Sequence, residues 1–155
     1  MKTKDILIKN GIIVFEDSAT RGDILIKNGK INKIADDISI GKSKNTKIID
    51  AAGKYIFPGA IDPHTHHELN LGPGRMSSDT FESGSAAALN GGVTTIFDFA
   101  HQELPAETLA QAYRRVAKNA SRAHNRVFLH SGIMKLTDDL EKQTIDAFKA
   151  GARSF

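Results

Sequence analysis

From Tyr55 onward the sequence alternates between short apolar, β-branched runs and longer amphipathic stretches, and this alternation limits the fold more than any other feature. Strict alternation of strand and helix favours a parallel sheet, because each helix carries the chain back to the edge where the previous strand began. The expected strands cover residues 56–63, 93–99 and 126–130, and a fourth begins at Arg153. These units amount to somewhat under half of an eight-stranded barrel.

Capping residues predict where the helices begin. The first helix is expected to start at Asp79, with Glu82 completing a capping box, and to end at Gly91. Pro105 suits the first position of the second helix, because its missing N–H would be unpaired there anyway. Thr137 is expected to cap the third helix. The side chains expected to face the core from the second and third helices are Leu109, Ala112, Tyr113, Val116, Ala117, Ala120, Leu140, Ile145 and Phe148.

An internal repeat marks the first fifty residues: Asp5–Gly11 recurs unchanged as Asp23–Gly29. Each copy is a β-branched run closed by Asn-Gly, the dipeptide that best tolerates the positive φ of a two-residue hairpin turn. Both copies are therefore expected to form hairpins, with return strands at residues 12–15 and 30–34 and a further strand at 46–50. So small a sheet needs a partner surface.

The composition is that of a globular domain, since 40% of the 155 residues are hydrophobic and 25% are charged. The chain has no cysteine, which excludes disulfides and thiolate metal sites. The net charge is +3, and no aromatic residues interleave with the lysines, so nucleic-acid binding is not expected. No apolar run approaches membrane-spanning length, and a soluble cytoplasmic protein is the expectation.

Two histidines one residue apart, His64 and His66, end the first predicted strand. In an extended segment residues i and i+2 share a face, so both imidazoles are expected to project the same way and one metal ion can take both as ligands. The plainer interpretation is a pair of hydrogen-bonded polar side chains. A loop rich in Gly and Pro follows at residues 71–74, and ligands that open onto such a loop are typical of an α/β active site.

Three blocks resemble a known family: FPGAIDPHTH at residues 57–66, DTFESG at 79–84 and GGVTTIFDF at 91–99. With their spacing they resemble the cyclic amidohydrolases, and within these the hydantoinase and dihydropyrimidinase branch. The resemblance implies an α/β fold, a TIM barrel preceded by a small β-sandwich that the far carboxyl end of the protein completes. It therefore predicts a portion of the sandwich at residues 1–54 and the amino-terminal part of the barrel at 55–155.

The resemblance also implies a divalent metal centre, most simply with two zinc ions. In this family the His-x-His pair binds one ion, a carbamylated lysine bridges both, and later histidines and an aspartate complete the site. Only His64 and His66 match these positions here. The family's lysine directly follows a pair like Ser154–Phe155, which ends this sequence. No catalytic residue is therefore expected within the chain, and we expect it to be an amino-terminal fragment that is inactive alone.

The implied reaction is hydrolysis of a small cyclic amide, such as a hydantoin or a dihydropyrimidine, to an N-carbamoyl amino acid. Relatives are often tetramers, so a homo-oligomer is expected at full length. Residues 68–78 match the family's first substrate-gating loop, in which Leu69, Leu71 and Met76 are expected to contact the ring substituent. An ordinary flexible connection is the alternative for this segment.

Other functions remain compatible with the same residues. An allantoinase or a dihydroorotase would use the same ligand pair. A non-catalytic scaffold of the same fold is a rival from another class, although scaffolds of this family lack metal ligands and this chain keeps both histidines. A small independent binding module of strands and helices is the third possibility, and cooperative unfolding of the chain as a monomer would favour it.

Four more polar residues lie near the predicted strand ends. Asp98 could face the site, or it could accept backbone hydrogen bonds, which is the commoner role of an aspartate in this position. His67 is expected on the face opposite to the ligand pair, with no role assigned. His101 and His130 are more often packing or loop histidines than ligands.

Overall fold

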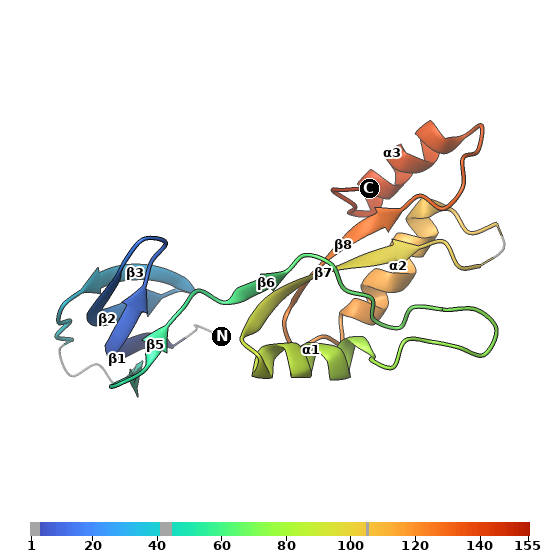
Figure 1. Ribbon diagram of the computed structural model, residues 1–155. Coiled ribbons are helices and arrows are strands. Elements are labelled where there is room, and N and C mark those ends of the chain that lie inside the picture. The colour runs from blue at the N-terminus through green and yellow to red at the C-terminus, as the bar shows by residue number, and fades with distance from the viewer. Residues whose placement is uncertain (1–3, 41–44, 105) are drawn as a thin grey trace. The chain divides into compact units, whose positions relative to one another are not determined.

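The computed structural model describes residues 4–40, 45–104 and 106–155, and the chain divides into two compact units, Met1–Pro58 and Gly59–Phe155 (Figure 1). The first unit is built from strands, and the second alternates strands with helices. Within the described ranges, no helix is both long and apolar enough to cross a membrane.

The first unit is a sheet with the order β3-β2-β1-β4, and the short β5 also pairs with β1. Its strands are β1 (Asp5–Val14), β2 (Ala19–Lys27), β3 (Lys30–Ala35), β4 (Thr46–Asp50) and β5 (Tyr55–Ile56). The pairs β1–β2 and β2–β3 are antiparallel, whereas β4 and β5 run parallel to β1. A small core holds the buried side chains of Leu7, Leu25 and Ile38.

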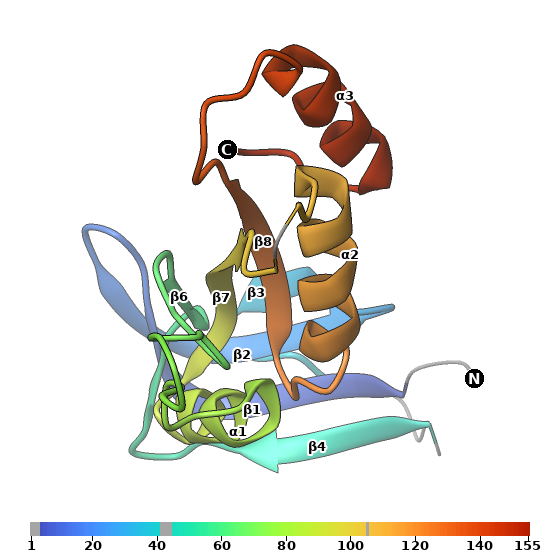
Figure 2. The same cartoon turned by 90° about the vertical axis from the view of Figure 1, so that its right-hand side faces the viewer.

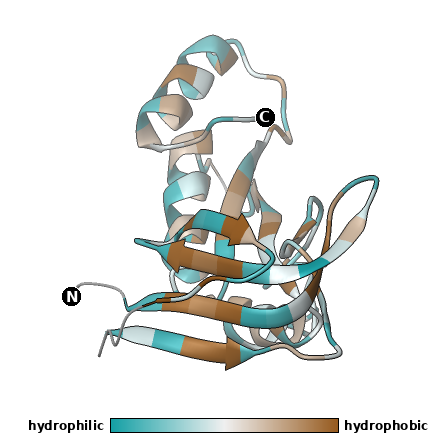
Figure 3. Cartoon of the chain, turned by 90° about the vertical axis from the view of Figure 1, so that its left-hand side faces the viewer, coloured by the Kyte–Doolittle hydropathy of each residue, from teal (hydrophilic) through white to brown (hydrophobic). Residues whose placement is uncertain are grey.

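Hydrophobic side chains also reach the surface of this sheet, and colouring by hydropathy shows apolar bands along its strands (Figure 3). The exposed isoleucines of the sheet are Ile31, Ile34, Ile48 and Ile49. The sheet therefore leaves part of its apolar surface uncovered within this unit, as expected for so few strands.

Only the second Asn-Gly pair forms the predicted turn. Asn28 and Gly29 have positive φ values of 50° and 73° and connect β2 to β3. Asn10 also has a positive φ, 63°, but β1 continues through Gly11 with a register shift against β2, so the prediction of a hairpin there is wrong. The buried carboxylate of Asp23 accepts the Asn10 N–H at 2.9 Å, which stabilises a bulge instead of a turn.

The second unit is a parallel sheet in the order β6-β7-β8 with a helix after each strand, which confirms the predicted alternation. Its elements are β6 (Ala60–Asp62), α1 (Phe81–Asn90), β7 (Val93–His101), α2 (Leu109–Ala120), β8 (Arg126–Gly132) and α3 (Leu140–Ala150). Helix α1 packs on β7, and α2 lies along both β7 and β8 (Figure 2). The core between them contains Phe81, Ala100, Val116 and Leu129.

The two outer ends of the predicted barrel sheet differ from expectation. Tyr55–Ile56 is β5 and pairs with β1, so the first strand of the second unit shrinks to Ala60–Asp62. A backbone hydrogen bond from Ser131 N to Ser154 O, at 3.0 Å, joins the last residues to β8, but residues 153–155 are not a strand. Because a strand needs a ladder of such bonds, the prediction of a fourth strand there is wrong for this structure.

The cap of α1 lies one position beyond the predicted one. The Thr80 hydroxyl accepts the Ser83 N–H at 3.1 Å, and Ser83 Oγ accepts the Thr80 N–H at 3.0 Å. Ser83 thus takes the role predicted for Glu82, and Asp79 instead accepts a hydrogen bond from Ser83 Oγ at 3.0 Å. The capping box is real, but a hydroxyl fills both of its positions.

Helix α2 begins after Thr108, whose hydroxyl accepts the Gln111 N–H at 3.3 Å. The predicted first residue, Pro105, lies outside the described residues. The predicted inner face of α2 is confirmed, because its members are buried or pack against the core. These residues are Leu109, Ala112, Tyr113, Val116, Ala117 and Ala120.

Helix α3 differs most from its prediction. It begins after Asp139 with no side-chain cap, so the expectation that Thr137 caps it is wrong. Ile145 and Phe148 were expected to face inward, but they are 48% and 55% exposed. The small side chain of Ala147 is buried instead, which lets α3 lie close against α2.

Candidate metal centre

Side chains on β7 alternate between the two faces of the parallel sheet. Ile96, Asp98 and Ala100 are buried on the face that α1 and α2 cover. The other face carries the half-buried side chains of Phe97, Phe99 and His101. The end of β7 therefore presents polar groups on both sides.

His64 and His66 follow β6 and turn their rings toward one point. Their Nε2 atoms are 3.0 Å apart, and both residues are exposed. Two nitrogens bound at about 2.0–2.1 Å to one tetrahedral zinc ion would lie about 3.3 Å apart, so the observed spacing fits two ligands of one ion. The same contact is a hydrogen bond when one of the two nitrogens carries a proton.

The neighbouring strand β7 holds the segment that carries these rings. Thr65 N donates to Phe97 O at 2.8 Å, which continues the pairing beyond β6. The Phe99 ring supports both imidazoles, with its centroid 4.6 Å from that of His64 and 5.1 Å from that of His66. The ligand candidates thus rest on an apolar surface that limits their rotation.

His67 points to the opposite face, as predicted, and meets Asp98 there. Its Nδ1 lies 2.7 Å from Asp98 Oδ2, and its backbone N–H donates to the same oxygen at 2.9 Å. Thr65 Oγ1 lies 2.9 Å from that oxygen, and Phe99 N donates to Oδ1 at 2.7 Å. Asp98 is 1% exposed, so its role is to accept hydrogen bonds within the fold rather than to face the ligand pair.

Asp98 and His67 each favour the charged form of the other. Burial acts to raise the pKa of Asp98, but the hydrogen bonds from His67, Phe99 and Thr65 together hold that pKa below its usual range. The hydrogen bond to Asp98 raises the pKa of His67, against the opposing effect of burial. The pair is therefore a buried carboxylate matched to an imidazole that tends to keep its proton.

His101 lies on the same face as the ligand candidates. Its ring stacks on Phe99 at 5.6 Å and on His66 at 5.9 Å. Its Nδ1 is buried against Gly132 and has no hydrogen-bond partner among the described residues. Burial, and after it the nearby His66, lowers the pKa of His101, which favours the neutral ring.

His130 shares that face but is engaged elsewhere. Its Nδ1 lies 2.6 Å from Ser154 Oγ, and its ring centroid is 5.0 Å from that of Phe99. Across the part of the chain that the structure describes, no group of three or more His, Cys, Asp or Glu side chains is arranged to hold a metal ion. The structure therefore brings two candidate ligands together, fewer than the three protein ligands that catalytic zinc sites usually have.

The loop after these histidines folds back on itself. Leu71 N donates to Arg75 O at 2.9 Å, and Ser77 N donates to Leu69 O at the same distance. Of the residues expected to contact substrate, Leu71 and Met76 are 51% and 61% exposed, whereas Leu69 is half-buried. Two exposed apolar side chains thus lie on a hydrogen-bonded loop rather than on an open connection.

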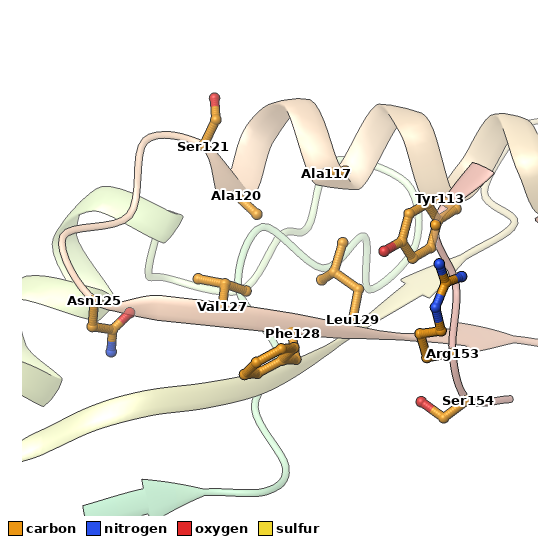
Figure 4. A pocket seen from close by; sticks show the side chains of 11 residues that line it. Tyr113, Ala117, Ala120, Ser121, Asn125, Val127, Phe128, Leu129, Arg153 and Ser154 are labelled. Carbon is orange, nitrogen blue, oxygen red and sulfur yellow. The ribbon is translucent and has the colours of Figure 1, made fainter. Parts of the chain in front are cut away.

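A pocket of about 310 Å³ lies away from the histidine pair, between α2 and β8 (Figure 4). Ala117 and Ala120 of α2 face Val127 and Leu129 of β8, and Arg153 lies at one end. Neither Phe99 nor any of the histidines of the candidate centre lines it.

Comparison with known proteins decides the family. The model of the amidohydrolase family matches residues 55–155, which include the histidine pair and the whole parallel sheet. The chain belongs to the amidohydrolase family.

Several curated relatives of this amidohydrolase are hydantoinases. D-hydantoinase from Geobacillus stearothermophilus is 37% identical over an alignment of 153 residues, and the match covers 92% of this chain and 31% of the relative. D-hydantoinase from Ralstonia pickettii is 48% identical over 99 residues, 64% of this chain and 21% of the relative. Dihydropyrimidinase 2 from Caenorhabditis briggsae is 41% identical over 112 residues, 71% of this chain and 20% of the relative. The chain thus spans about a third or less of their length.

Solved structures give the same family branch. A D-hydantoinase (dihydropyrimidinase) from Thermus sp. matches 97% of this chain and 32% of its own, with a TM-score of 0.85 and 32% identity. An L-hydantoinase (dihydropyrimidinase) from Arthrobacter aurescens matches 96% of this chain and 32% of its own, with a TM-score of 0.73 and 31% identity. These likenesses confirm the predicted α/β fold class and the predicted resemblance.

Sequence reasoning placed the histidine pair of this amidohydrolase but missed the pairing of Asp98 with His67. The two residues are 31 positions apart, and the residues around each of them give no sign of the other as its partner. The sequence of β7 did contain a sign of this burial. Asp98 alternates with the apolar Ile96 and Ala100 and therefore shares their buried face. A buried carboxylate requires a partner, and His67 was the polar residue left without a role.

Proposed function

We propose that this amidohydrolase chain carries the His-x-His part of the site of a metal-dependent hydrolase that opens cyclic amides of the hydantoin or dihydropyrimidine type to N-carbamoyl amino acids. The proposal rests on the convergence of His64 Nε2 and His66 Nε2 to 3.0 Å at the end of β6. The chain is similar to relatives named D-hydantoinase and Dihydropyrimidinase 2, and these names support the substrate class.

The chemistry requires a divalent ion, which when bound supplies a hydroxide near neutral pH and polarises the amide carbonyl. His64 and His66 would hold it as neutral imidazoles. We favour zinc, because imidazole nitrogen suits zinc, whereas calcium and magnesium prefer oxygen ligands. A second zinc and a bridging carbamylated lysine would need ligands beyond these two histidines.

The remaining residues of the chain have roles in orientation and substrate choice. The Phe99 ring packs against both imidazole rings. We assign contact with the ring substituent to Leu69, Leu71 and Met76, because the loop presents apolar side chains next to the ligand pair in sequence. Removal of water around the substrate strengthens the polar interactions that drive such a reaction.

The proposal extends to the organisation of the protein. We assign residues 1–54 to a portion of a β-sandwich and residues 55–155 to the amino-terminal part of a TIM barrel. We further propose a cytoplasmic homo-oligomer that acts on a small cyclic amide rather than on nucleic acid or membrane. Size-exclusion chromatography with light scattering on a protein that contains the whole barrel would test the assembly.

A chimera tests the reaction directly. Residues 1–155 replace the matching part of the D-hydantoinase from Geobacillus stearothermophilus, with which they align over 153 residues. We expect the folded chimera to open hydantoin or dihydrouracil. His64→Ala and His66→Ala should each abolish turnover and lower the bound zinc. His124→Ala is the matched control, because His124 precedes β8, at the opposite end of the parallel sheet.

The outcomes separate the parts of the proposal. Ring opening and zinc content that do not depend on His64 or His66 would overturn the assignment of the ligand pair. A folded chimera that holds zinc but opens no hydantoin and no dihydrouracil would overturn the substrate class. The 155-residue chain alone is expected to show no turnover, because catalytic zinc sites have three protein ligands and it supplies two.

A further inference from the structure

We propose that Asp98 is a positioning residue that holds the segment His64–Thr65–His66 in its metal-binding conformation from the far side of the sheet. This inference rests on the proposed function, because it concerns the same pair of ligands. Asp98 acts through Thr65 and His67, which stand immediately before and after His66 in the chain.

One carboxylate oxygen of Asp98 forms hydrogen bonds with both sequence neighbours of His66. Asp98 Oδ2 lies 2.9 Å from Thr65 Oγ1, 2.9 Å from His67 N and 2.7 Å from His67 Nδ1. The Thr65 hydroxyl on one side of His66 and the His67 backbone and ring on the other all contact one buried atom, so the peptide that carries the His66 imidazole has little freedom to turn. Charge-assisted hydrogen bonds of this kind are shorter and stronger than neutral ones.

The carboxylate is itself held through both of its oxygens. Its other oxygen accepts Phe99 N–H at 2.7 Å, and Phe99 is the residue whose ring supports both imidazoles. Asp98 is buried on the side of the sheet that α1 and α2 cover. One residue thus fixes the backbone of the ligand segment and the backbone of the aromatic surface under it.

His67 locks this arrangement to α1. Its ring lies 5.3 Å from that of Phe81 and against Gly84, where a Cβ would overlap it. The next residue, Glu68, accepts Phe81 N–H at 3.3 Å and forms an ion pair with Arg122. The segment after the ligands is therefore held at successive positions by the helix layer.

The geometry assigns Asp98 an indirect role. His64 and His66 lie on the face of Phe99, whereas Asp98 and His67 lie on the opposite face of the same sheet. A ligand set must be held within about 0.5 Å to bind its ion well, and outer residues that orient ligands typically change metal affinity about 10- to 100-fold when removed. Asp98 is placed to act in this way without touching the ion.

The test measures zinc binding by the 155-residue chain, using isothermal titration calorimetry with Zn²⁺ and the NOE between the rings of His64 and His66. Asp98→Asn and His67→Leu should each weaken zinc binding by about tenfold or more and reduce that NOE. His67→Gln keeps an N–H donor toward Asp98, so it should restore affinity to within about threefold of the wild type.

Asp23→Asn is the matched control. Asp23 is equally buried at 1% exposure and accepts backbone N–H groups of Asn10 and Ile38, but it lies in the first unit. This variant should lose stability and keep its zinc affinity, so general destabilisation is distinguished from lost positioning. If Asp98→Asn does not fold, the comparison of His67→Leu with His67→Gln decides the question.

Wild-type zinc affinity in folded Asp98→Asn and His67→Leu variants would overturn the inference, as would a loss in Asp23→Asn of the same size. His64→Ala distinguishes this failure from that of the proposed function. If His64→Ala lowers zinc affinity while Asp98→Asn does not, the ligand pair stands and the positioning role fails. If His64→Ala leaves zinc affinity unchanged, the proposed ligand pair itself is wrong.

Discussion

His67 lies so close to Gly84 of α1 that a Cβ on that glycine would overlap the imidazole ring. Alanine in a helix interior normally gains about 0.5–1 kcal/mol over glycine. Here the overlap should dominate, because inserting a methyl group into a packed site costs about 1–3 kcal/mol. We expect Gly84→Ala to lower the free energy of unfolding by about 1–2 kcal/mol in urea denaturation.

Gly91→Ala is the control for this prediction, because a Cβ on Gly91 would meet Ala88 O at 3.5 Å and Ala87 O at 3.9 Å, which are ordinary contacts. Gly91 has a negative φ of −86°, so alanine fits there without backbone strain. Equal stability of the two variants would show that His67 does not pack against α1 as the structure has it.

Acid should destabilise the chain partly through Glu107. The Arg115 guanidinium, followed by the N–H groups of Glu103 and Leu104, holds the pKa of Glu107 below its usual value of 4.5, against the effect of burial. A carboxyl group whose pKa is lower in the folded state stabilises the fold fully above the unfolded value, and this stabilisation is lost as the pH falls through the folded value. The window therefore lies below about pH 4.5.

Glu107→Gln should remove this part of the acid response. At neutral pH we expect it to cost about 1–3 kcal/mol, because the buried carboxylate accepts charge-assisted hydrogen bonds from Arg115, Nε at 2.9 Å among them. The difference from wild type should shrink below pH 4.5 in urea unfolding followed across pH. Glu141→Gln, at an exposed position in α3, should show neither effect. A constant difference across pH would contradict the assignment.

The helix caps give a second pair of matched variants. Thr108→Ala should cost about 1 kcal/mol, because the Thr108 hydroxyl accepts the Gln111 N–H at the start of α2. Thr137→Ala should change stability by less than about 0.5 kcal/mol, because the Thr137 hydroxyl contacts the side chains of Asp139 and Gln143 and caps no backbone N–H of α3. Thermal unfolding of both variants measures the two losses of stability. A larger loss in Thr137→Ala than in Thr108→Ala would contradict these assignments of the helix caps.

The sequence predicted most of the second unit because its signals are local. Alternating apolar runs marked β7 and β8, and the spacing of Leu109 and Val116 marked the buried face of α2. The convergence of His64 and His66 also followed from local geometry, since residues i and i+2 share a face.

The features that sequence reasoning missed depend on distant partners. Asn10 with Gly11 is a dipeptide typical of turns, but the Asp23 carboxylate accepts the Asn10 N–H and stabilises a bulge there instead. Phe148 has helical spacing for an inward face, but α3 packs on α2 through the smaller Ala147. The pairing of Asp98 with His67 was missed for the same reason, because the two residues are 31 positions apart and no local pattern predicts such a contact.

The loop after the ligand pair should govern substrate choice rather than metal binding. In the hydantoinase chimera, replacing Leu71 and Met76 together with alanine should raise KM for hydantoins with a bulky ring substituent and leave zinc content unchanged. Their exposure predicts a stability change within about 0.5 kcal/mol. Leu136→Ala, at an 88% exposed position, is the control. Unchanged KM values for all substituents would contradict a role for these side chains.

The most direct test of the account is side-chain ¹⁵N NMR of the histidines during a zinc titration of this chain. His64 and His66 are predicted to shift together at Nε2 and to saturate at one ion per chain, while His124 and His130 stay unchanged. Zinc-dependent shifts at other histidines with none at His64 and His66, or no shift at all, would contradict the claim that this pair binds one metal ion.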